Sequence, residues 1–91
     1  MAERIATIAS RVGLHARPAA VFTEAARGTG LDITIAAQDA PVADAVDASS
    51  ILALMSLGIH HGDRVVLRAE GPDAEAALDA LSRILETDHD A

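Results

Sequence analysis

Apolar and polar residues alternate along several short stretches, and this alternation predicts β-strands. The clearest is residues 31–37 (LDITIAA), where apolar side chains at odd positions alternate with Asp32 and Thr34. Residues 63–70 alternate again, which places Val65 and Leu67 on one face. Two less regular strands are expected over 3–9 and 42–46, with a turn at 38–41 leading into the second of these.

Three other segments have the spacing or composition of helices. Residues 16–27 are rich in alanine, and we expect Gly28 to end this helix in the left-handed conformation. Residues 49–57 form a short helix that begins at Ser49 or Ser50 and is closed by Gly58. Residues 73–86 repeat apolar side chains every three or four positions, as in an amphipathic helix.

The resulting order is β-α-β-β-α-β-α, which predicts an α+β fold. Short connections favour a four-stranded antiparallel sheet with the three helices on one face and solvent on the other. A chain of 91 residues suits one domain over 1–91, and we expect residues 87–91 to be a frayed acidic tail.

Composition and charge narrow the function classes. The chain has no cysteine, which excludes disulfides, thiolate metal sites and a cysteine nucleophile. It has no apolar run long enough to cross a membrane and no signal-peptide pattern, so we expect a soluble cytoplasmic protein. The formal charge of −7 argues against nucleic acid as a partner. We expect no metal and no cofactor, and we interpret the "HHGD" at residues 60–63 as a turn before a strand.

The segment "GLHARPAA", residues 13–20, carries the most specific chemistry. Pro18 is tolerated in the first turn of a helix, so His15 lies at or just before the helix entrance. Free amides and the positive end of the helix dipole attract phosphate there. The His15 imidazole is a nucleophile near neutral pH, and the Arg17 guanidinium is a fork suited to phosphate oxygens.

A solvated surface pair is the simpler interpretation of a histidine and an arginine two residues apart. However, two cations at a helix N-terminus oppose its dipole, so their presence there favours an anionic ligand. No Ser-His-Asp or metal-ligand spacing surrounds His15. The histidine is therefore expected to accept and donate a group itself.

The "GLHARPAA" segment resembles the active-site motif of the histidine-containing phosphocarrier (HPr) family of the bacterial phosphoenolpyruvate-dependent sugar phosphotransferase system. "SSILALMSLGI", residues 49–59, resembles the second signature of the same family, in the right order and at the right separation. The resemblance implies an open-faced β-sandwich covering nearly the whole chain. It implies that His15 carries the phosphoryl group on Nδ1, that Arg17 assists transfer, and that Ser50 is a regulatory phosphorylation site.

The same resemblance implies the partners. The chain would be a monomeric carrier rather than a free-standing enzyme, loaded by enzyme I and emptied onto IIA domains of sugar permeases. A kinase/phosphorylase acting on Ser50 and a regulatory transcription factor are further partners in some members. The implied docking residues are Phe22, Arg27, Ile51, Leu54 and Met55. Glu24 and Ala53 depart from the family, since lysine is common at both positions.

Three alternatives stay open at the level of sequence. The same chemistry could serve a nitrogen-related or a dihydroxyacetone phosphotransferase branch. The domain could also bind partners without any phosphotransfer. Finally, Ser49 and Ser50 could be helix caps and nothing more.

Overall fold

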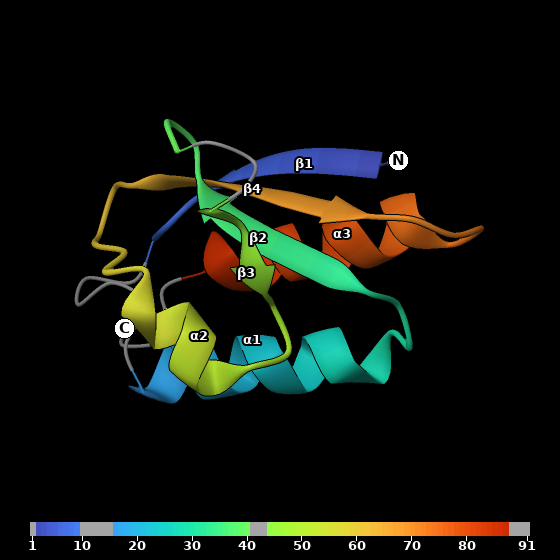
Figure 1. Ribbon diagram of the computed structural model, residues 1–91, viewed down its shortest axis with the longest axis horizontal. Helices are drawn as coiled ribbons and strands as arrows, with labels where there is room; N and C mark the ends of the chain where they lie inside the picture. Colours follow the sequence, from blue (N-terminus) through green and yellow to red (C-terminus); the bar gives the residue numbers. More distant parts are fainter. Residues whose placement is uncertain (1, 10–15, 41–43, 88–91) are drawn as a thin grey trace.

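The computed structural model describes residues 2–9, 16–40 and 44–87, and the side chains of these residues except at 16–18. Four strands and three helices follow one another in the predicted β-α-β-β-α-β-α order (Figure 1). Their bounds are β1 Ala2–Thr7, α1 Ala16–Gly28, β2 Ile33–Ala37, β3 Val46–Asp47, α2 Ile51–Ser56, β4 Arg64–Ala69 and α3 Ala74–Leu85.

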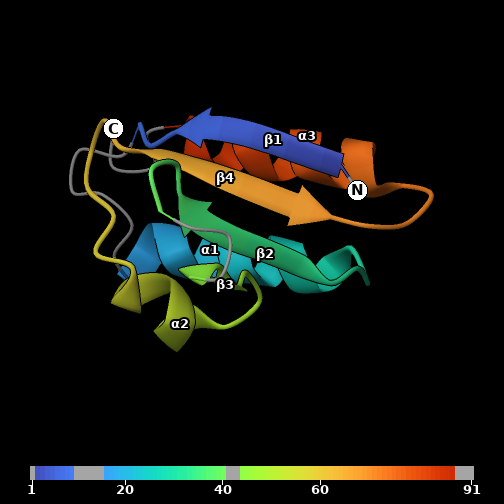
Figure 2. The same ribbon diagram turned by 45° about the horizontal axis from the view of Figure 1, so that its top comes forward.

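The strands form one antiparallel sheet in the order β1-β4-β2-β3. Its register aligns Ile5 of β1 with Val66 of β4, and Val66 with Ala36 of β2. The helices α1 and α3 cover one face, and α2 lies beside α1 at the margin of this layer (Figures 1 and 2). The predicted fold class, with helices on one face of an antiparallel sheet, is confirmed.

Strand alternation gives the sheet its buried face. Ile33 and Ile35 of β2 are 3% and 0% exposed, while Asp32 before them is exposed and Thr34 is half-buried. Val65 and Leu67 of β4 are both fully buried on the same side. The core between sheet and helices is therefore built from aliphatic side chains, with one aromatic ring inside it.

Helix α3 closes this core as its periodicity predicted. Its buried residues are Ala74, Leu78, Leu81, Ser82 and Leu85. They recur every three or four positions, so one stripe of the helix contacts the sheet and the opposite stripe meets solvent. Two ion pairs also involve α3, because Asp79 contacts Arg4 of β1 at 2.8 Å and Arg83 at 3.0 Å.

The end of α1 differs from the prediction. Gly28 is still helical, and the left-handed residue is Gly30, with φ +70°. The Thr29 hydroxyl donates to the carbonyl of Ala26 at 2.7 Å, and the amide of Gly30 donates to Arg27 at 3.2 Å. The helix thus ends one residue later than predicted, and the chain reverses at Gly30, where the absence of a Cβ permits the left-handed conformation.

The third strand is shorter than expected. It comprises Val46 and Asp47, which pair with Ile35 and Thr34 of β2, whereas the prediction placed a strand over 42–46. Residues 41–43 lie outside the described part of the chain. At the other end, residues 88–91 of the expected frayed tail also lie outside it.

Candidate functional site

Helix α1 begins at Ala16, the residue bonded to His15. His15 itself lies outside the described residues, and so does the side chain of Arg17, whose backbone belongs to the first helical turn. Pro18 is also in this turn, where its missing amide hydrogen costs nothing. The first turn contains no acidic residue, so no carboxylate of its own neutralises the positive end of the helix dipole.

Helix α2 begins with a side-chain cap at Ser50. Its Oγ accepts a hydrogen bond from the amide of Ala53 at 3.3 Å, and its own backbone is extended. Ser49, the other predicted cap, has a different role: its amide and its hydroxyl both donate to Oδ1 of Asp47, at 2.9 and 2.7 Å. Gly58, with φ +64°, follows the helix as predicted.

An arginine ties the two helices together at this point. Nε of Arg27, in the last turn of α1, donates to the carbonyl of Ser49 at 3.1 Å. The hydrogen bonds from Ser49 lower the pKa of Asp47, and the positive charge of Arg27 lowers it further. Part of the hydrogen-bonding capacity of Arg27 is therefore used inside the molecule, although its side chain is exposed.

Two of the five expected docking residues do not lie on the surface. Phe22 and Leu54 are both 0% exposed and belong to the hydrophobic core. Phe22 is on the stripe of α1 that faces the sheet, and Leu54 is the one buried residue of α2. Their expected role as contact residues is corrected: they support the surface from beneath.

Other apolar side chains occupy the surface instead. Leu52 is 80% exposed, Met55 43% and Val21 41%, while Ile51 is half-buried. We call Val21, Leu52 and Met55 the apolar helix surface. Sequence reasoning missed Leu52 and Val21. Once the structure shows Leu54 pointing inward, the exposure of Leu52 follows, because two residues span about 200° of a helix.

The charged groups beside the apolar helix surface are few. Glu24 and Arg27 are the charged residues of α1 from residue 19 onward, and both are exposed. Helix α2 contains no charged residue at all. The described part of these two helices therefore carries one positive and one negative charge.

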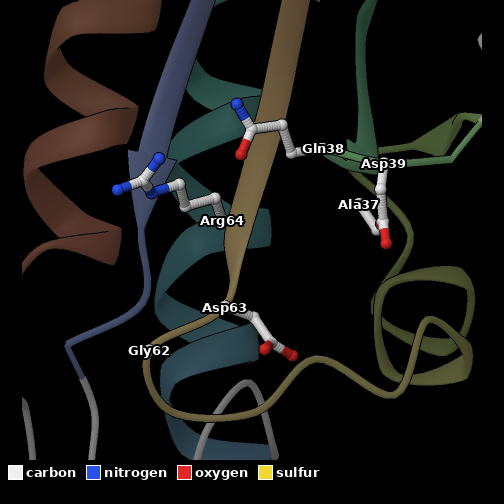
Figure 3. Close-up of a pocket in the computed structure, with 6 residues that line it drawn as sticks. All are labelled: Ala37, Gln38, Asp39, Gly62, Asp63 and Arg64. Carbon is white, nitrogen blue, oxygen red and sulfur yellow. The ribbon is translucent and has the colours of Figure 1, made fainter.

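A cavity of about 650 Å³ opens where β2 ends and β4 begins (Figure 3). It is lined by Ala37, Gln38, Asp39, Gly62, Asp63 and Arg64. Oδ2 of Asp63 accepts the amide of His60 at 2.9 Å, which confirms the predicted turn over 60–63. Figure 3 shows Arg64 extending toward β1, away from the two carboxylates. The charged side chains that line this cavity do not point toward a common centre, and no predicted site residue lines the cavity.

Within the described ranges, no three His, Asp or Glu side chains are grouped so that they could hold a metal ion. No helix in the same part of the chain is long and apolar enough to cross a membrane.

Comparisons with known proteins agree on one family. The family model described as "PTS HPr component phosphorylation site" matches residues 2–87. The phosphocarrier protein HPr of Haloferax volcanii is 48% identical over 85 residues, covering 93% of each chain. That of Streptomyces coelicolor is 42% identical and covers 93% of this chain and 88% of the relative. The crystal structure of a phosphocarrier protein HPr from Bacillus anthracis superposes with a TM-score of 0.82 at 36% identity, covering 92% of this chain and 95% of the other.

Proposed function

The chain belongs to the HPr family of phosphoryl carriers in the phosphotransferase system, and we propose that its phosphoryl group is carried by His15. In this proposal Nδ1 of His15 attacks the phosphoryl group of phosphorylated enzyme I. The N–P bond to His15 forms as the bond to enzyme I breaks. A IIA domain of a sugar permease then takes the group, and His15 is freed. The comparisons give no support to a binding domain without phosphotransfer.

The position of His15 in the sequence, immediately before the first residue of α1, supports this proposal. The residue after it opens a helix of 13 residues with no acid in its first turn. Amides and dipole at such an entrance stabilise the negative charge of a phosphoryl group on the preceding residue. A neutral imidazole has an unprotonated ring nitrogen, which can act as the nucleophile.

Arg17 is assigned to stabilising charge during transfer. Its backbone lies in the first turn of α1, and it follows His15 by two residues in the sequence. A guanidinium binds two phosphate oxygens at once, and charge on these oxygens redistributes as the phosphoryl group moves. The conservative variant Arg17→Lys keeps the charge but loses the fork, so it should slow transfer.

Ser50 is proposed as the site of regulatory phosphorylation by a kinase/phosphorylase, with a transcription factor that recognises the product. The hydrogen bonds of the two neighbouring serines favour Ser50 over Ser49 as the phosphorylation site. The Ser49 hydroxyl donates to the Asp47 carboxylate, which would repel a phosphoryl group placed there. Ser50 Oγ serves as an acceptor for Ala53, so its own hydroxyl hydrogen is not used by this cap. Enzyme I and these regulators would place the carrier in the cytoplasm.

Incubation with phosphoenolpyruvate and enzyme I tests the carrier assignment. The wild type should gain one phosphoryl group by mass, and the label should be acid-labile and base-stable. His15→Ala should gain none while keeping its circular dichroism spectrum. Arg17→Lys should be labelled at a lower rate. Full labelling of His15→Ala would assign the phosphoryl group to another residue.

A further inference from the structure

We propose that Asp47 is the residue that directs regulatory phosphorylation to Ser50 and keeps it away from Ser49. The inference rests on the proposed function, in which a kinase/phosphorylase acts on Ser50. In that reaction the Ser50 hydroxyl oxygen attacks the γ-phosphorus of ATP. The new O–P bond forms as the bond to the β–γ bridging oxygen breaks, so ADP leaves and the hydroxyl proton passes to a base of the kinase.

Neither exposure nor position separates the two serines. Ser49 and Ser50 are consecutive, both are half-buried, and both precede the first residue of α2. An enzyme that reaches one hydroxyl from solvent therefore also comes close to the other. The difference between the two residues lies in their hydrogen bonds.

Ser49 is held by a carboxylate. Its hydroxyl donates to Oδ1 of Asp47 at 2.7 Å, and its amide donates to the same oxygen at 2.9 Å. These hydrogen bonds lower the pKa of Asp47, so the carboxylate is ionised at neutral pH. The hydroxyl hydrogen of Ser49 is therefore bound to a full negative charge.

Phosphorylation of Ser49 is opposed by this arrangement in two ways. The Ser49 oxygen would lose its hydrogen, and with it the hydrogen bond to Asp47. The phosphoryl group would also place nearly two negative charges beside the carboxylate. At a separation of about 4 Å in water, repulsion of this size corresponds to about a tenfold lower rate of transfer.

Ser50 meets neither obstacle. Its Oγ accepts the amide of Ala53 at 3.3 Å, and its own amide donates to the carbonyl of Asp47 at 3.1 Å. Neither contact uses the hydroxyl hydrogen, which is the atom that leaves on phosphorylation. Within the described ranges, no carboxylate is hydrogen-bonded to the Ser50 side chain.

Arg27 stabilises the same arrangement from α1. Its Nε donates to the carbonyl of Ser49 at 3.1 Å, and its positive charge favours the ionised form of Asp47. The segment from Asp47 to Ser49 is thus fixed to α1, with the Asp47 carboxylate bound to Ser49 and not to the side chain of Ser50.

Phosphorylation by a purified kinase/phosphorylase with ATP, followed by mass, tests the inference in a Ser50→Ala background. We expect the wild type to gain one phosphoryl group at Ser50, and Ser50→Ala to be labelled at a low or undetectable rate. Adding Asp47→Asn to Ser50→Ala should raise the rate of labelling at Ser49 about tenfold. The reason is that an amide still offers an oxygen acceptor but carries no charge.

Asp44→Asn in the same background is the matched control. Asp44 is an exposed acid three residues before Asp47, so its replacement changes the net charge by the same amount. It should leave the rate of labelling at Ser49 unchanged. Equal rates for the Asp44→Asn and Asp47→Asn proteins would overturn the proposal, because the kinase itself would then select the serine. Circular dichroism shows whether each variant is folded.

The wild type and the single variants separate the two levels of failure. If the kinase does not phosphorylate the wild type at Ser50, the regulatory assignment fails and this inference fails with it. If the wild type is phosphorylated at Ser50 but Ser50→Ala is labelled equally fast at Ser49, only the role of Asp47 is wrong. The carrier assignment to His15 is tested separately with enzyme I and does not depend on either result.

Discussion

Helices α2 and α3 flank the same core but use their apolar side chains in opposite ways. Helix α3 has 12 residues and packs on β1, β4 and α1, with four aliphatic residues and Ser82 buried along one stripe. Helix α2 has six residues and packs on α1 and β3, with Leu54 alone buried. Its other apolar side chains, Leu52 and Met55 above all, meet solvent.

The comparison shows that apolar side chains have two different roles in this protein. In α3 an apolar position contributes to the free energy of unfolding, because solvent is excluded from it. In α2, Leu52 and Met55 remain exposed to solvent, and Ile51 is only partly buried against the core. A short helix that is apolar nearly all round is therefore a sign of binding rather than of stability.

The largest expected effect follows from burial in α3. Leu78 is 1% exposed, so Leu78→Ala should lower the free energy of unfolding by about 2–5 kcal/mol, through lost transfer energy and a cavity. Leu52→Ala in α2 should change it by less than about 0.5 kcal/mol, as for other surface substitutions. Urea denaturation measures both values. Similar losses in the two variants would contradict the division between α2 and α3.

A smaller effect is expected at the α2 cap, where stability and binding can be separated. Ser50→Ala should cost about 1 kcal/mol of unfolding free energy, because the amide of Ala53 loses its acceptor. Ser50→Asp should keep the cap and the stability. It should nevertheless weaken binding to enzyme I, since a carboxylate beside the apolar helix surface must be desolvated.

Melting curves and calorimetric titration of these two variants decide between the roles of Ser50. Unchanged affinity for Ser50→Asp would leave Ser50 as a cap only. The Ala variant is the control, because it alters the cap without adding charge.

The smallest expected effect is the part of the stability loss at low pH that comes from the ion pairs of α3. The hydrogen bond from Arg4 holds the pKa of Asp79 below its usual range, and the charge of Arg83 lowers it further. The folded protein thus binds this proton more weakly than the unfolded chain does. The stabilisation is present above the unfolded pKa of about 4 and is lost as pH falls through the lower folded value.

Asp79→Asn has no carboxylate to protonate, so its stability should fall less steeply than that of the wild type below about pH 4. Because the pair is exposed to solvent, the difference should be small and should shrink in high salt. Thermal melts over a pH series measure it. Glu70→Gln, an exposed substitution in the loop before α3, is the control and should retain the wild-type slope.

Local sequence determined the elements of this protein and their order. Alternation in 31–37 and 63–70 and the periodicity of 73–86 predicted β2, β4 and α3 within a few residues, because those patterns match one buried face. Ser50 and Gly58 marked the ends of α2 through chemistry that requires no distant contact. The segment around His15 points to a phosphoryl carrier through its residue types and its resemblance to the family motif.

On α1 and α2, only the tertiary structure decided which apolar residues are inside. Phe22, Leu54 and Leu52 are equally hydrophobic in sequence, yet two are buried and one is 80% exposed. The difference depends on which element covers each helix face, and a six-residue helix has too few turns for its own periodicity to reveal this. The contact of Arg27 with Ser49 likewise joins segments 22 residues apart in the chain. Only the packing of α1 against α2 brings these groups together.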